Sequence, residues 1–288
     1  MTAPRKVADP NLDRDYDLRA AFPDYAAYFD DWRQRSRRAR DELACLLDVQ
    51  YGPSVRDRVD FFPAASQPAP LLVYIHGGYW RWLDKSDFSF LAVPFVKRGV
   101  SLAIVNYDLF PGTTMSRVVT QVRSAYAWIA ENAPRIGVPW SRMHLAGWSA
   151  GAHLSAMLLC TPGRAGRLPV ASLLAISGIY DLTPIVETSA NADLGLDLAE
   201  AARNSPLRLP PPDPACPVAL VWGAGETAAF RNQSASLAKA WREQGMEIAT
   251  LEVPNVHHYA VMNRLGEESS EVFAQAARLL RLQTSVRA

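Results

Sequence analysis

Cysteine is scarce in this chain. The 288 residues contain three cysteines, Cys45, Cys160 and Cys216, which lie far apart and mostly in apolar surroundings. An odd and scattered set of this kind fits neither a disulfide framework nor a cysteine-based metal site. We therefore expect buried free thiols, and no metal.

Long apolar runs and an excess of charge are also missing. No stretch reaches the roughly 18 uninterrupted apolar residues of a membrane span, and the opening residues 1–6 lack the apolar core of a secretory signal. We expect no membrane association and a cytoplasmic location. The net charge of +1 provides no electrostatic drive toward nucleic acid. The arginines between positions 33 and 40 are interpreted as a solvated helix face, because acidic residues flank them.

Strand-like and helix-like segments alternate along the chain, which favours an α/β fold with a mainly parallel sheet covered on both faces. The expected strands are 56–62, 71–75, 101–107, the run ending at 146, 170–177, 218–222 and 247–253. Helices are expected at 88–96, 116–132, 152–159 and 230–244, and after residue 258. We expect residues 1–288 to form a single domain, since this length suits one α/β unit.

Two segments are expected to be added to this core. Residues 1–50 form an N-terminal helical entry segment, whose apolar residues at helical spacing are Tyr25, Tyr28, Phe29, Trp32, Ala39, Leu43, Leu46 and Leu47. Residues 181–210 read as an irregular, partly helical insertion, long enough to act as a lid.

The segment Gly147-Trp148-Ser149-Ala150-Gly151 stands between a strand-like run and a helix-like run. This is the context of a nucleophile elbow, in which a serine is held on a sharp turn from strand to helix. Gly147 and Gly151 are small enough to let the strand and the helix approach closely. Ser149 is therefore the candidate nucleophile.

A second glycine motif, His76-Gly77-Gly78-Tyr79-Trp80, follows the apolar run 71–75. It predicts a loop whose N–H groups stabilise an oxyanion, with Gly78, Tyr79 and Ala150 as the three donors. The alternative is a glycine-rich turn that only ends a strand. For His76 we expect a structural role, hydrogen-bonding the loop.

A serine nucleophile needs a base and an acid, which follow it in the order acid, then histidine, in this strand–turn–helix setting. Glu226 comes just after the strand 218–222, and His257 and His258 come after the strand 247–253. His258 is favoured because the apolar residues that follow it would anchor a helix start. His257 is the alternative base and Asp181 the alternative acid.

A Gly-rich segment at 223–228 mimics a dinucleotide-binding fingerprint. That reading is rejected because only about one strand remains before the chain ends, whereas such a site needs further parallel strands. His144 and His153 are interpreted as ordinary strand and helix residues.

With these motifs in place, the chain resembles the kynurenine formamidases, α/β-hydrolases with a His-Gly-Gly-x-Trp signature. The similarity extends through 83–88, 105–109, 177–182 and 230–234 and covers nearly the whole chain. It implies that the acid lies four residues before Phe230, which is Glu226, and that the histidine precedes an aromatic residue, which is His258.

This sequence departs from the family pattern at two positions. Glu226 replaces the usual Asp, and Trp148 replaces the His that usually precedes the nucleophile. The resemblance implies hydrolysis of an N-formyl arylamide by a Ser-His-Glu triad without a cofactor, as when N-formylkynurenine gives formate and kynurenine in tryptophan catabolism.

Aromatic residues near the motifs are candidates for substrate binding, and the selected ones are Trp80, Trp148, Tyr180 and Tyr259. A carboxylesterase or carbamate hydrolase with the same triad is an open alternative, because fold does not fix substrate. A ligand-binding protein on an inactive hydrolase scaffold is a third reading. The expected partner is a small-molecule substrate, and a homodimer is left open.

Overall fold

The computed structural model describes residues 9–160 and 168–282. They contain one sheet of eight strands in the order β1-β2-β4-β3-β5-β6-β7-β8. β1 and β2 are antiparallel to their neighbours, whereas β4, β3, β5, β6, β7 and β8 run parallel. The bounds are β1 Leu46–Gln50, β2 Arg58–Phe62, β3 Leu71–Ile75, β4 Ser101–Val105, β5 Met143–Trp148, β6 Ser172–Ile176, β7 Val218–Gly223 and β8 Ile248–Val253. The predicted mainly parallel sheet is confirmed.

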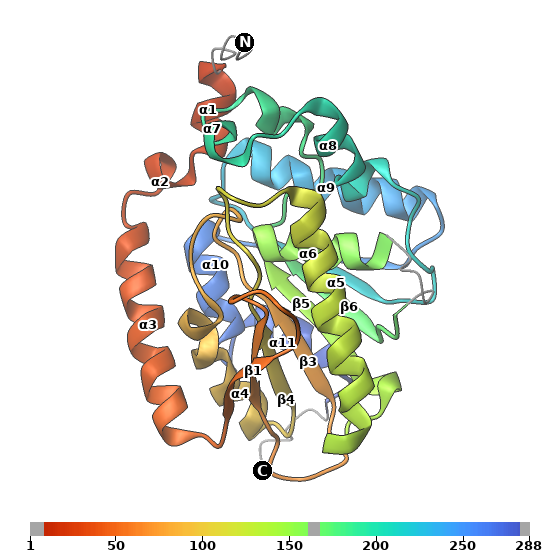
Figure 1. Ribbon diagram of the computed structural model, residues 1–288. Helices are drawn as coiled ribbons and strands as arrows, with labels where there is room; N and C mark the ends of the chain where they lie inside the picture. Colours follow the sequence, from red (N-terminus) through yellow and green to blue (C-terminus); the bar gives the residue numbers. More distant parts are fainter. Residues whose placement is uncertain (1–8, 161–167, 283–288) are drawn as a thin grey trace.

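Helices cover both faces of the sheet (Figure 1). One face carries α5 (Met115–Asn132), α6 (Ala150–Cys160) and α9 (Ala228–Glu243), and the other carries α4 (Ala92–Lys97), α10 (His258–Leu265) and α11 (Glu271–Leu279). Because both faces are covered, every residue of β3, β4, β5 and β6 is buried. This explains why these strands are continuous apolar runs rather than alternating patterns.

The N-terminal segment is helical only in part. It contains α1 (Pro10–Tyr16), α2 (Leu18–Ala21) and α3 (Tyr25–Glu42), and α3 buries Phe29, Trp32 and Ala39. The expectation of a helical face through Leu47 is wrong, because Leu43 is extended and Leu46 and Leu47 lie in β1, 58% and 44% exposed. The chain leaves the helix there because β1 pairs with β2 and extends the sheet.

The 181–210 segment is irregular and partly helical, as predicted. It contains η4 (Thr183–Glu187), α7 (Asn191–Leu194), α8 (Leu198–Arg203) and η5 (Pro206–Arg208). Together with α1 it lies above the edge of the sheet where the parallel strands end (Figure 1). The remaining short helices are η1 (Lys85–Leu91), η2 (Ala133–Ile136) and η3 (Trp140–Arg142).

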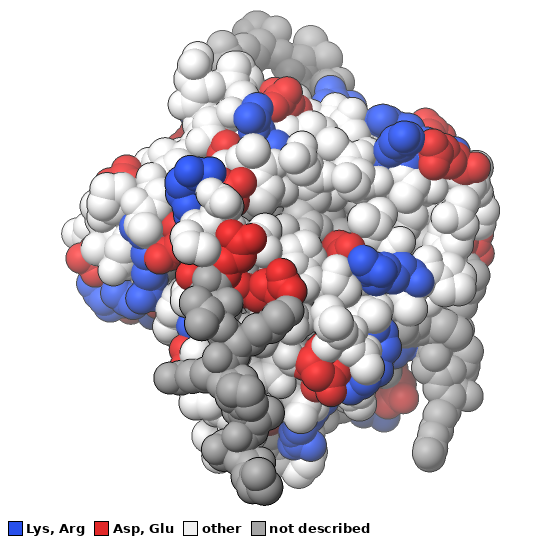
Figure 2. Space-filling view, turned by 90° about the horizontal axis from the view of Figure 1, so that it is seen from above, with Lys and Arg blue, Asp and Glu red and all other residues white. Residues whose placement is uncertain are grey.

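Figure 2 shows this upper face, where basic and acidic side chains alternate with broad uncharged areas. The arginines of α3 are engaged locally: Arg33 pairs with Asp30 and Asp87, and Arg35 pairs with Asp31. No helix in the described ranges is both long enough and apolar enough to cross a membrane. The three cysteines are free thiols, and burial raises the pKa of Cys160 to about 12.

Candidate active site

Ser149 lies on the turn between β5 and α6, with a left-handed backbone φ of 57°. Its side chain is buried, with 2% of the residue exposed. The flanking glycines are needed for close approach: a Cβ on Gly147 would overlap the backbone of Gly151, and a Cβ on Gly151 would overlap the carbonyl oxygen of Ile75. The predicted elbow is therefore present, and its strain is held by a strand and a helix in direct contact.

The His76–Trp80 loop lies beside the elbow. Gly78, Tyr79 and Trp80 all have positive φ values, 113°, 55° and 55°. In the described part of the chain, the N–H groups of Gly78 and Tyr79 donate to no protein acceptor. Ala150 is the first residue of α6, so its N–H has no intrahelical acceptor. These are the three groups predicted to form an oxyanion hole.

His76 holds the loop. Its Nδ1 lies 2.7 Å from the Gly77 carbonyl oxygen, and its Nε2 lies 3.0 Å from Oδ1 of Asn106. Complete burial lowers the pKa of His76 to about 4, against the smaller opposing effect of the Gly77 bond. The neutral imidazole has a single N–H, which it donates to one of these two oxygens, and this is the structural role that we expected.

Glu226 lies in the turn after β7, and its carboxylate is held by three groups. Oε1 accepts hydrogen bonds from the Gly223 N–H (2.8 Å) and from the Ser177 hydroxyl. Oε2 lies 3.2 Å from Nδ1 of His258. The longer side chain of Glu, compared with Asp, therefore folds back over its own turn and still reaches the histidine.

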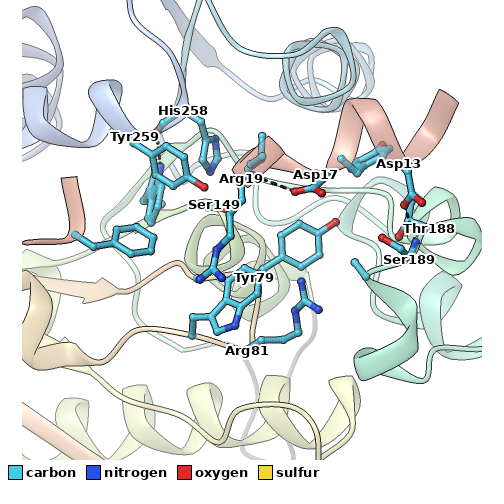
Figure 3. A pocket seen from close by; sticks show the side chains of 17 residues that line it. Asp13, Asp17, Arg19, Tyr79, Arg81, Ser149, Thr188, Ser189, His258 and Tyr259 are labelled. Atoms are coloured by element: carbon cyan, nitrogen blue, oxygen red, sulfur yellow. Dashed lines mark hydrogen bonds between the residues drawn. The ribbon is translucent and has the colours of Figure 1, made fainter. Parts of the chain in front are cut away.

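His258 is the first residue of α10 and is 1% exposed. Because Glu226 occupies Nδ1, the free ring atom is Nε2, which is buried without a hydrogen-bond partner in the described structure. His258 and Ser149 line the same cavity (Figure 3). The sheet thus brings all three predicted triad positions to one edge.

The alternative base and acid have other partners. His257 caps α10 by accepting the Tyr259 N–H, stacks on Phe22 with ring centroids 4.6 Å apart, and faces Asp24. Asp181 forms a bidentate pair with Arg208, at 2.9 Å and 3.0 Å. Burial opposes ionisation of Asp181, but hydrogen bonds from Arg208 and Thr183 outweigh it and lower the pKa.

The cavity has a volume of about 270 Å³ and is lined by residues from five parts of the chain. α1, α2 and α3 contribute Asp13, Tyr16, Asp17, Leu18, Arg19 and Phe29; the loop after β3 contributes Gly78, Tyr79, Arg81 and Trp82; the elbow contributes Trp148 and Ser149; the segment after η4 contributes Thr188, Ser189 and Ala190; and α10 contributes His258 and Tyr259. In Figure 3, His258 and Tyr259 lie on one side of the cavity, and Asp13, Thr188 and Ser189 lie on the other, which is called the outer end below. Charged residues of both signs line the cavity.

The four aromatic residues predicted to bind substrate separate into two pairs. Trp148 and Tyr259 line the cavity, whereas Trp80 and Tyr180 are not among its lining residues. Trp80 is fully buried with its ring edge-on to His153, and Tyr180 is fully buried with its backbone N–H on Gln233. Trp148 also supports the histidine, because its Nε1 donates to the His258 carbonyl (3.0 Å).

Sequence reasoning missed two parts of the site. One is Ser177, which donates to Glu226 from the end of β6; its position at the end of a parallel strand was the available signal. The other is the contribution of α1 and α2, which no motif marked. No cluster of three or more histidine, cysteine or acidic residues suited to a metal ion occurs within residues 9–160 and 168–282.

The family model BD-FAE matches residues 60–190, which span both motifs. Kynurenine formamidase from Danio rerio is 34% identical over 242 residues, 81% of this chain and 81% of its own length. The kynurenine formamidase of Drosophila melanogaster is 28% identical over 253 residues, 83% of each chain.

Solved structures agree on the fold. A Silicibacter sp. protein described as a candidate thioesterase is 30% identical, with a TM-score of 0.82 over 91% of this chain and 97% of its own. Esterase LipW from Mycobacterium marinum has a TM-score of 0.72 at 17% identity, over 96% and 95% of the two chains, and is evidence of fold alone. The fold is that of the α/β-hydrolases, and the chain is a hydrolase that belongs to the kynurenine formamidase family.

Proposed function

We propose that this protein hydrolyses N-formyl arylamides such as N-formylkynurenine, releasing formate and the arylamine. Ser149 is the nucleophile, His258 the general base and acid, and Glu226 the acid that orients the imidazole. The observation that carries the proposal is the state of the His258 ring: Nδ1 faces Glu226, while Nε2 is buried without a partner in the cavity that Ser149 also lines.

The first half of the reaction forms a formyl-enzyme. Ser149 Oγ attacks the formyl carbon as His258 Nε2 accepts its proton, and Glu226 stabilises the resulting imidazolium. The N–H groups of Gly78, Tyr79 and Ala150 receive the developing oxyanion. Each such donor is typically worth about 3 kcal/mol in the transition state. His258 then gives its proton to the arylamine nitrogen, and the C–N bond breaks.

The second half repeats these steps with water. His258 Nε2 takes a proton from water as its oxygen attacks the formyl carbon of the ester. The oxyanion returns to the same three N–H groups. Collapse of the intermediate breaks the ester bond, and His258 returns the proton to Ser149 Oγ while formate leaves. His258 carries the proton that moves in each step; the second water proton leaves with the acid, which ionises to formate by releasing that proton to solvent.

The family and the cavity both support this substrate class. Relatives that match over most of this chain are kynurenine formamidases, and Trp148 and Tyr259 provide an aromatic wall for an aryl group. A small-ester hydrolase is the second candidate, because the same triad also cleaves esters and the fold does not fix the substrate.

The deciding experiment is the rate of N-formyl-L-kynurenine deformylation by the purified protein, with p-nitrophenyl acetate as an ester reference. We expect efficient deformylation, reduced by about 10⁴-fold or more in Ser149→Ala. Ser234→Ala is the matched control, because Ser234 is a buried serine outside the cavity. Cleavage of the ester without cleavage of the formamide would move the assignment to an esterase.

A further inference from the structure

Arg19 projects from the short helix α2 into the active-site cavity (Figure 3). Its guanidinium carbon lies 3.6 Å from the centre of the Trp82 ring and 4.8 Å from that of Tyr25. Its Nε is buried and has no hydrogen-bond partner, and no carboxylate in residues 9–160 and 168–282 forms an ion pair with it. Arg19 is therefore a cation held against an aromatic ring inside the cavity, with its charge uncompensated by a direct partner.

Two further polar groups surround the same space. Arg81 also packs on Trp82, 4.2 Å from the ring centre, and its Nε is buried without a partner. The hydroxyl of Tyr79 is likewise buried and unpartnered. Figure 3 shows the Arg19 side chain between His258 and Tyr79, with Arg81 beyond Tyr79.

The two arginines differ in their ion pairs. Arg81 donates to Asp193 at 2.6 Å, so a protein carboxylate already balances its charge. The acidic residues that line the cavity with Arg19 are engaged with backbone groups: Asp17 caps α2, and Asp13 accepts the Ser189 N–H. Among the cavity's cations, Arg19 is thus the one left to receive an anion.

Buried donors without partners are costly, and a ligand that supplies acceptors removes the cost. A guanidinium group has planar donors that match a carboxylate in two-point geometry, and packing on an aromatic ring fixes that plane in advance. Asp13 and Asp17 on the same cavity wall add negative charge a short distance away. A cavity with both signs at its outer end fits the charged end of an α-amino acid.

We propose that Arg19 binds a carboxylate of the substrate, with Arg81 and the Tyr79 hydroxyl completing the subsite. The protein is then selective for N-formyl arylamides that carry an α-amino acid group, over neutral formanilides. This inference rests on the proposed function, because it says which residue binds the end of the substrate that is remote from the formamide.

The test compares two substrates that share the reacting group. N-formyl-L-kynurenine carries the carboxylate, whereas N-(2-acetylphenyl)formamide has the same ortho-acyl formanilide without the amino acid. We expect Arg19→Gln to lower kcat/KM for formylkynurenine by about 30-fold and to change that for the neutral formamide less than threefold. The preference for formylkynurenine over the neutral formamide should therefore fall by about tenfold or more in Arg19→Gln.

Arg14→Gln is the matched control. Arg14 lies on the preceding helix, α1; its side chain is 75% exposed, and it does not line the cavity. It should leave both substrates unchanged. An equal loss on both substrates in Arg19→Gln would show that Arg19 only packs α2 against Trp82, and would overturn the carboxylate subsite. Equal wild-type kcat/KM for the two substrates would also overturn it.

A binding measurement separates this inference from the proposed function. Calorimetric titration with L-kynurenine and with 2-aminoacetophenone needs no turnover. If Arg19→Gln weakens the binding of L-kynurenine but not that of 2-aminoacetophenone, the subsite is supported. This holds even if the protein hydrolyses neither formamide, although that absence of hydrolysis would refute the formamidase activity. Unchanged binding of L-kynurenine in Arg19→Gln would refute the subsite, whatever the activity.

Discussion

The floor and the outer end of the cavity are built in different ways. The floor, formed by Ser149, Glu226, His258 and the Gly78–Tyr79 N–H groups, stands at the carboxyl ends of β3, β5, β7 and β8. Its three side-chain residues are buried, and each follows within a few residues the end of a strand that sheet pairing holds in place. The outer end comes from α1, α2 and the segment after η4, which lie far apart in the sequence.

Polar contacts tie the outer end together in place of sheet hydrogen bonds. Asp13 accepts the Ser189 N–H, the Asp9 N–H donates to Glu187, and Arg81 pairs with Asp193. The proposed catalytic residues therefore stand on the rigid sheet. The proposed binding of the substrate's charged end depends on short helices that a few hydrogen bonds and ion pairs hold in place. We therefore expect changes at the floor to affect kcat, and changes at the outer end to affect KM.

After loss of the nucleophile itself, the largest effect is expected for Glu226→Gln. The neutral amide cannot stabilise an imidazolium, and its NH2 group must face either the Gly223 and Ser177 donors or the N–H of His258. We expect kcat for formylkynurenine to fall by about 10³- to 10⁴-fold. Glu252→Gln is the control, because Glu252 is half-exposed and its carboxylate forms only a long ion pair, 3.9 Å from Arg231. A loss below tenfold in Glu226→Gln would remove Glu226 from the triad.

Low pH should lower the unfolding free energy of the protein, because three buried histidines must then take up protons. Burial lowers the pKa values of His76, His144 and His153 to about 4. The folded state favours the neutral rings, so their stability contribution is complete above pH 6.5 and is lost as the pH falls toward 4. At pH values below about 4, each of these histidines lowers the unfolding free energy by about 3 kcal/mol.

Urea unfolding between pH 8 and pH 4 measures this loss. The unfolding free energy should be flat above pH 7 and should fall steeply below pH 6.5. Asp84, whose pKa is lowered to about 2 chiefly by hydrogen bonds from Ser86 and Asn106 against the effect of burial, acts only at lower pH. Constant stability down to pH 4.5 would contradict neutral, tightly packed histidines.

A smaller effect is expected for Ser177→Ala. Glu226 loses one of the two donors to Oε1 but keeps the Gly223 N–H, so the carboxylate is less firmly oriented. We expect kcat to fall about tenfold with KM unchanged, in line with the loss of one charge-assisted hydrogen bond. Ser234→Ala, which removes an unpartnered hydroxyl, should keep full kcat. A change in KM alone would argue against a positioning role for Ser177.

The smallest effect is expected at the outer end. Asp193→Ala removes the partner of Arg81 while leaving the floor intact, and Asp193 is half-exposed. Exposed pairs are typically worth up to about 1 kcal/mol, so we expect KM for formylkynurenine to change about two- to fivefold with kcat preserved. Initial rates over a range of substrate concentrations separate the two constants. A fall in kcat above tenfold would show that the two regions are not independent.

Much of the floor could be predicted from the sequence because its signals are local. Gly147 and Gly151 indicate a close approach of strand and helix, and the ends of apolar runs predict where the parallel strands end. The choice of His258 over His257 rested on the residues that follow it. In the structure His258 faces Glu226, whereas His257 caps α10 and stacks on Phe22.

Other features could not be predicted because they depend on distant segments. Leu46 and Leu47 continue the helical spacing of α3, yet pairing with β2 places them in a strand. Trp80 and Tyr180 stand beside the motifs, but the packing of His153 and Gln233 against them takes them away from the cavity lining. Spacing along the chain does not report such contacts.

Residue size and apolar spacing within a few positions are enough to predict the elements from β2 onward, the elbow at Ser149 and the glycine loop. The packing of distant segments sets the rest: Ser177 supports Glu226, Trp148 supports the His258 backbone, and Arg19 enters the cavity. These contacts join residues that are far apart in the chain, and their geometry is set by how the layers pack rather than by any local pattern.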